Sequence, residues 1–170
     1  MARQRAEERV NIRPEVSILS VLKHLNYKPW FAVAEFVDNA IQSFLSNRDS
    51  IASVDGPDAK LRIAVEMDAS AEARIVIRDN AAGICDRDYA RAFKAAEAPP
   101  DRTGLSEFGM GMKSAACWLA SEWTVRTTAM GEDVERTVSF DVSAIIQNRL
   151  EELTIQFRDV ATGTHTPKSP

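Results

Sequence analysis

The sequence predicts a single α+β domain, a two-layer sandwich in which helices cover one face of a mostly antiparallel sheet. The chain has 170 residues, 45% of them hydrophobic, which is enough for one sizeable core but not for two domains. Some segments repeat apolar residues at helical spacing, and others alternate apolar with polar residues as strands do. That alternation indicates strands with one buried and one solvated face, which is typical of antiparallel sheets.

Helical periodicity recurs in three segments. Apolar residues fit an amphipathic helix over 14–25, a longer one over 30–45 and a short apolar helix over 114–120. The helix 30–45 carries its apolar residues on one stripe and leaves polar side chains on the opposite face. Residues 49–60 include an Asp-Gly-Pro sequence and are predicted to form a loop.

Alternation predicts strands at 61–67, 74–79, 123–129, 134–142 and 153–158, with a short helix between the last two. The first strand is expected to be buried on one face. In the second, Asp79 shares a face with Ile75 and Ile77, so its carboxylate is expected to point inward at the strand end. The polar stretch 83–108 is predicted to be a mobile loop that carries a short helix near 89–96.

Composition excludes several classes of function. Acidic residues (25) slightly outnumber basic ones (21), so the net charge of -4 gives no reason to propose a direct nucleic-acid surface. Cys85 and Cys117 lie outside any zinc or redox spacing and are predicted to be reduced thiols. No apolar run approaches the roughly 20 residues of a membrane helix, and the N-terminus is charged rather than signal-like. The sequence therefore predicts a cytoplasmic protein without membrane contact.

The polar face of the helix 30–45 carries the first candidate site. Glu35 and Asn39 are four residues apart and stack on this face, and Gln42 follows one turn later. Such a face often serves solubility alone. However, Asn39 offers a carboxamide oxygen that Mg²⁺ accepts, and Glu35 could hold a water for attack on a phosphate.

Asp79 begins the second candidate site, because it leaves a strand and Gly83 follows four residues later. A plain turn would give the same pattern. A buried aspartate without partners costs roughly 1–3 kcal/mol, so hydrogen-bond donors are expected, and the exocyclic amine of adenine is one. Gly83 would let the backbone approach a planar ring closely.

A glycine-rich segment leads into the helix 114–120 and forms the third candidate site. Closely spaced glycines expose backbone N–H groups, and a helix N-terminus adds partial positive charge, so together they suit an anion such as phosphate. Lys113 either helps to bind that anion or is simply solvated. The spacing matches neither a P-loop nor a dinucleotide-binding fingerprint.

In this order, the three sites resemble the motifs of the GHKL ATPases, the superfamily of gyrase B, Hsp-type chaperones, histidine kinases and MutL. The motifs correspond to residues 35–39, 79–83 and 104–113, and Gly163 with Thr164 resembles the late Gly-Thr motif. The segments 28–40 and 108–114 look most like MORC-type members. Ala81 departs from the pattern, since it replaces a glycine of the second motif, and Gln42 stands where many relatives have aspartate.

The resemblance spans 14–164 and implies the Bergerat ATP-binding fold with a lid near 87–108, a charged leader at 1–13 and a tail at 165–170. It implies that Glu35 is the general base, that Asn39 binds Mg²⁺ and that Asp79 reads adenine with support from Thr164. The other positions implied to bind the nucleotide are Gly83, Ile84, Gly104, Leu105, Phe108, Gly109, Met110, Gly111, Met112 and Lys113.

The implied function is binding and slow hydrolysis of Mg-ATP, which drives a conformational and dimerisation switch. Turnover is expected to be weak without a transducer domain or partner protein, and the expected partners are ATP and a second copy of the chain. Two alternatives stay open. A nucleotide-ordered binding or scaffold module would not need Glu35, and a histidine-kinase-like domain acting in trans would need an acceptor that neither His24 nor His165 resembles.

Overall fold

The computed structural model describes residues 16–94 and 110–160. Several positions named above lie outside the described residues: the leader, the tail, most of the expected lid, and Gly104, Leu105, Phe108, Gly109, Gly163 and Thr164.

Helices and strands together confirm the α+β class. The helices are α1 (Ile18–Leu22), α2 (Pro29–Ser46), α3 (Arg48–Asp55), α4 (Tyr89–Phe93), α5 (Gly111–Leu119) and α6 (Val142–Asn148), and a 3₁₀ turn at Asp86–Asp88 precedes α4. The strands are β1 (Ile63–Asp68), β2 (Arg74–Asp79), β3 (Glu122–Thr128), β4 (Val134–Asp141) and β5 (Ile155–Asp159). The predicted strands, the long helix and the short helix before β5 all lie within a few residues of these bounds.

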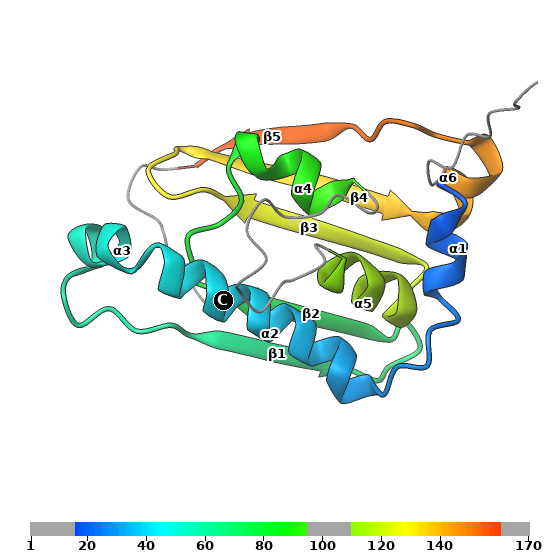
Figure 1. Ribbon diagram of the computed structural model, residues 1–170, viewed down its shortest axis with the longest axis horizontal. Coiled ribbons are helices and arrows are strands. Elements are labelled where there is room, and N and C mark those ends of the chain that lie inside the picture. The colour runs from blue at the N-terminus through cyan, green and yellow to red at the C-terminus, as the bar shows by residue number, and fades with distance from the viewer. Residues whose placement is uncertain (1–15, 95–109, 161–170) are drawn as a thin grey trace, which may run out of the picture.

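The strands form two antiparallel sheets. β1 pairs with β2, so that Ile63 lies opposite Asp79. β3, β4 and β5 form a meander in which β4 is central, with Val138 paired to both neighbouring strands. Within the described residues, no ladder of hydrogen bonds joins β2 to β3. Helices α2 and α5 pack side by side and cross in front of the strands (Figure 1).

The carboxyl ends of β2 and β3 meet, which joins the two sheets. Met130 N–H donates to the Ala82 carbonyl at 2.9 Å, and Ile84 N–H donates to the Thr127 hydroxyl at 2.8 Å. Between these bonds, Gly83 has φ of +70°, and a Cβ there would overlap the carbonyl oxygen of Thr128. The chain after β2 can therefore reach β3 only with glycine at this position.

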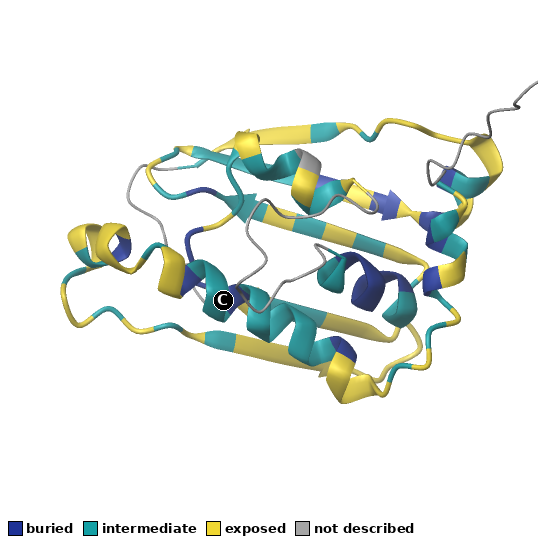
Figure 2. Ribbon diagram, viewed as in Figure 1, coloured by how far each residue is buried: buried dark blue, intermediate teal, exposed yellow. Residues whose placement is uncertain are grey.

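The larger core lies between helices α1, α5 and α6 and the three-stranded sheet. Its buried members are Leu19, Leu22, Cys117, Val138, Phe140, Val142 and Ile145. Trp123 stacks on Phe140 with ring centroids 3.7 Å apart, which extends this core across β3 and β4. A smaller cluster of Phe44, Ile51 and Ala81 lies at the far end of α2. Figure 2 shows buried segments in α5 and β4, whereas β1 is largely exposed.

Two predictions of local structure are wrong. Residues 48–55 form α3 rather than a loop, because Ile51 is only 1% exposed and packs against Phe44, and such packing stabilises a short helix. The face of β1 that was expected to be buried is open, with Val65 42% and Met67 71% exposed. In the parts of the chain that the structure describes, no helix is both long and apolar enough to cross a bilayer.

Candidate active site

Helix α2 places Glu35 and Asn39 one turn apart, as predicted. The helix begins at Pro29, a residue that suits a first helical position, and Lys28 before it is extended. Both site residues are half-buried. Gln42, one turn further on, donates to the Ser46 hydroxyl at 3.0 Å, which orients its amide along the helix.

The amino end of α5 lies against Glu35. Gly111 is the first residue of α5, and a Cβ built on it would overlap Oε2 of Glu35. The first and third predicted motifs therefore meet in space, although they lie far apart in the sequence. A carboxylate at this place is next to the partially positive end of the helix.

The surroundings of Glu35 raise the pKa of its carboxyl above the ordinary value. Burial has the largest effect, the negative charge of Asp38 adds to it, and a hydrogen bond with the Tyr27 side chain opposes both. A higher pKa makes the carboxylate a stronger base, as a group that takes a proton from water requires. No motif in the sequence identified Tyr27, which precedes α2.

Asp79 differs from its predicted orientation. The residue is exposed, and its carboxylate accepts a hydrogen bond from Ala81 N–H at 2.9 Å. The argument that a buried carboxylate needs an outside donor is therefore wrong, because the strand end itself supplies one. The adenine-reading role stays a prediction from the resemblance.

The residues after Asp79 are largely explained by packing. Asn80 is buried, accepts a hydrogen bond from Arg62 N–H at 2.6 Å and donates one to the Lys60 carbonyl at 3.1 Å. These bonds fix the backbone just before β1. Ala81 is 6% exposed within the cluster of Phe44 and Ile51. The methyl group that departs from the family pattern is thus accommodated in the core.

Lys113 is buried, which rules out the solvated side chain that was one of its two predicted roles, and its role in nucleotide binding stays a prediction. Its exposed fraction is 2%, and its ammonium donates to the Arg91 carbonyl in α4 at 2.7 Å. This bond links α4 to α5 at a helix end where carbonyl groups lack helical partners. Met110, Gly111 and Met112 are half-buried at the start of α5, where the phosphate site was predicted.

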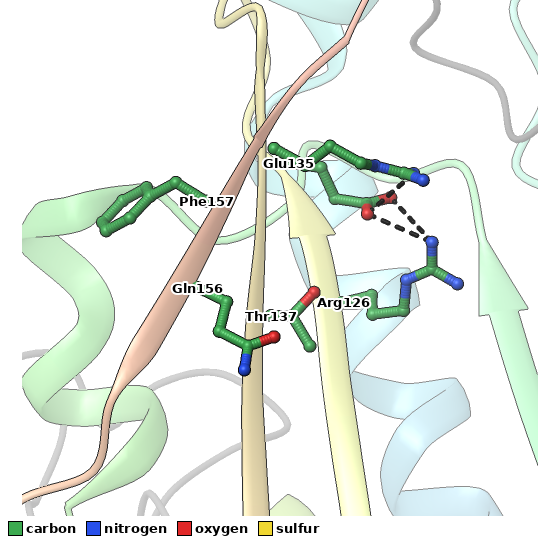
Figure 3. Close-up of a pocket in the computed structure, with 6 residues that line it drawn as sticks. Arg126, Glu135, Thr137, Gln156 and Phe157 are labelled. Carbon is green, nitrogen blue, oxygen red and sulfur yellow. Dashed lines mark hydrogen bonds and ion pairs between the residues drawn. The ribbon is translucent and has the colours of Figure 1, made fainter.

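Two hollows in the described part of the chain lie away from these residues. One, of about 260 Å³, is on the outer face of the meander, where Arg126 and Arg158 both pair with Glu135 at 3.1 and 2.8 Å (Figure 3). Phe157 points away from that group in Figure 3. The other, of about 310 Å³, lies between Leu19, Phe93 and Ile155.

The donor set near Glu35 fits a magnesium ion that is bound largely through its substrate. The described residues contain no group of three or more His, Cys, Asp or Glu side chains that could hold a metal by themselves. Mg²⁺ is commonly held by one or two protein oxygens together with substrate phosphates and water. The half-buried side-chain amide of Asn39, one helical turn from Glu35, suits this mode of Mg²⁺ binding.

The structure is thus an α+β protein in which the helical layer brings an acidic residue and a glycine at a helix start together, an arrangement that suits an anionic ligand. Residues 27–165 match the family described as histidine kinase-, DNA gyrase B-, and HSP90-like ATPase. The chain belongs to this family, whose members bind ATP with Mg²⁺. Comparison with curated proteins gave no significant match.

Proposed function

We propose that this domain binds Mg-ATP between α2 and the amino end of α5 and hydrolyses it slowly, with Glu35 as general base. The observation that carries the proposal is the contact between Glu35 and the first residue of α5. A phosphate at that helix start would lie within reach of a water held by the carboxylate.

The chemistry assigns a separate task to each residue. Glu35 takes a proton from the attacking water as the new bond to the γ-phosphorus forms and the bond to the bridging oxygen breaks. Positioning and charge stabilisation supply most of the rate in such transfers. Asn39 would hold Mg²⁺, and Asp79 would accept a hydrogen bond from the adenine amine, in exchange for or in addition to the bond from Ala81.

The switch is the finer part of the proposal. The bond from buried Lys113 to Arg91 connects the start of α5 to α4, which lies within the expected lid. Nucleotide that engages the start of α5 would therefore act on α4 as well, and lid closure would favour a dimer in the ATP state. The motif sequences resemble those of MORC-type members, and we expect a transducer domain or partner protein to raise turnover.

Calorimetry and phosphate release test the binding and hydrolysis steps. Asp79→Asn is expected to weaken Mg-ATP binding roughly 10- to 100-fold, since it removes a charged hydrogen-bond acceptor. Glu35→Gln is expected to bind normally but to lose roughly 10²- to 10⁴-fold in hydrolysis. Equal phosphate release from the wild type and from Glu35→Gln would favour the nucleotide-ordered binding module. Absence of ATP binding by the wild type would contradict the proposal.

A further inference from the structure

One backbone bond and one side-chain bond fix the loop after β2 to the end of β3. Met130 N–H donates to the Ala82 carbonyl at 2.9 Å, and this bond needs no particular side chain. Ile84 N–H instead donates to the Thr127 hydroxyl at 2.8 Å. The second bond therefore depends on the identity of the residue at position 127.

The Thr127 side chain lies on the core side of β3. Alternate side chains of a strand share a face, so Thr127 is on the same face as Trp123, which stacks on Phe140. Thr127 is half-buried, whereas Thr124, on the opposite face of the strand, is exposed. Ile84 is also half-buried. Its N–H would be costly to leave without the threonine acceptor, because water reaches it poorly.

The loop that Thr127 holds carries the residues expected to read adenine. Asp79 ends β2, and its carboxylate accepts a hydrogen bond from Ala81 N–H at 2.9 Å. Gly83 and Ile84 follow as further positions implied to bind the nucleotide. The loop is short, so a shift of Ile84 would also move the backbone of Gly83 relative to the Asp79 carboxylate.

The packing of Gly83 sets the direction in which the loop can shift. A Cβ built on Gly83 would overlap the carbonyl oxygen of Thr128, so the loop backbone already touches the end of β3. A loop that is no longer held can therefore move away from β3 but not toward it. The bond between Ile84 and Thr127 opposes this outward movement.

We propose that Thr127 is a positioning residue for adenine recognition, whose hydroxyl holds the loop at 80–84 where Asp79 and the Gly83 backbone can both engage the base. The inference rests on the proposed binding of Mg-ATP. In that proposal the groups that face the phosphates belong to α2 and α5, whereas Thr127 lies on β3. Loss of its hydroxyl should therefore weaken nucleotide binding and leave the chemical step unchanged.

The first test compares Thr127→Val with Thr127→Ser. Valine has no hydrogen-bond acceptor, so we expect the calorimetric Kd and the KM for Mg-ATP to rise roughly 3- to 10-fold, the equivalent of one hydrogen bond. The kcat at saturating ATP should stay within about twofold. Thr127→Ser keeps the hydroxyl and should bind Mg-ATP nearly as the wild type does.

Thr124→Val is the matched control on the same strand. It removes a hydroxyl that bonds the Ser139 hydroxyl at 3.0 Å on the exposed face, so Kd, KM and kcat should not change. Wild-type affinity in folded Thr127→Val, or equal weakening by Thr127→Val and Thr127→Ser, would overturn the positioning role.

The choice of base is a second readout, which a general loss of stability would not move. Thr127→Val should weaken binding of Mg-ATP more than binding of Mg-GTP, because guanine lacks the amine that Asp79 is proposed to read. Equal weakening of both nucleotides would overturn the inference. Failure of the wild type to bind Mg-ATP, or an unchanged Kd in Asp79→Asn, would instead overturn the proposed function.

Amide hydrogen exchange tests the bond itself without nucleotide. In Thr127→Val, exchange at Ile84 should speed up roughly 3- to 10-fold, because its acceptor is gone. Exchange at Met130, whose acceptor is the backbone of Ala82, should change less. Unchanged exchange at Ile84 in the folded variant would show that Thr127 does not hold the loop and would overturn the inference.

Discussion

At Gly111 the absence of a side chain leaves room for the carboxylate of Glu35. Its backbone is not in the left-handed region, since the glycines with positive φ in the described residues are Gly56, Gly83 and Gly131. The requirement at Gly111 is therefore one of space alone. The group that a Cβ would meet is the movable end of a side chain, so the fold can tolerate a methyl group better than the site can.

Gly111→Ala separates stability from activity. We expect the melting temperature to stay the same or rise slightly, because alanine is the better helix former. ATP hydrolysis should fall roughly 10- to 100-fold, since the methyl group displaces the Glu35 carboxylate. Thermal unfolding and phosphate release measured on one preparation check both parts. Full activity in a folded variant would show that Glu35 does not need this position.

Residue types alone predicted which helix carries Glu35 and Asn39, because a spacing of four residues fixes their common face. They did not reveal Tyr27 or the burial of Lys113. Tyr27 takes its place because Trp118 of α5 packs against its ring, and this contact depends on tertiary packing. Lys113 is buried where a carbonyl of α4 accepts a hydrogen bond from its ammonium, a partner that local sequence cannot indicate.

At the scale of elements, the contact between the ends of β2 and β3 depends on Gly83. Gly131 offers a matched comparison, because its φ of +79° is similar to the +70° of Gly83 but nothing lies within 4 Å of the place of its Cβ. Alanine would strain the backbone at both positions. Only at Gly83 would the added Cβ also clash with the backbone of Thr128.

We expect Gly131→Ala to lower the free energy of unfolding by about 1–2 kcal/mol, the usual cost of a left-handed alanine. Gly83→Ala should cost clearly more, because the Thr128 carbonyl must also move. Urea unfolding of the two variants measures the difference. Equal losses would mean that the end of β2 can move away from β3 at no cost.

Element boundaries were predicted to within one residue in β4 and α2, and at both ends of β2, although no residue of β2 is buried. The Asp-Gly-Pro sequence favoured a loop at 49–60, but it marks only the end of α3, whose last residue is followed by Gly56. The exposed face of β1 was misread because alternation shows that two faces differ, not that a partner covers either of them.

At the scale of the whole molecule, burial makes the Glu35 carboxylate more basic and lowers the stability of the folded protein at neutral pH. Its pKa is raised in the folded state, so the folded protein holds this proton more tightly than the unfolded chain does. The charged carboxylate therefore destabilises the fold above the raised pKa. The penalty disappears as the pH falls through that pKa and below the ordinary value near 4.5.

Glu35→Gln is accordingly expected to be more stable than the wild type at pH 7, and the difference should shrink as the pH is lowered toward 4.5. Urea unfolding of both proteins across this pH range is the measurement, with Glu122→Gln on an exposed position of β3 as the control. A difference in the free energy of unfolding between the two proteins that does not depend on pH would contradict the raised pKa of Glu35.

The contact between Trp118 and Tyr27 also has an optical consequence. The chain has three tryptophans, and each occupies a different environment. Trp30 is 61% exposed, Trp123 stacks on Phe140 in the core, and Trp118 lies against the ring of Tyr27, which precedes α2. Indole emission responds to its surroundings, so a protein that keeps only Trp118 would carry an intrinsic fluorescent reporter on α5, the helix whose amino end contacts Glu35.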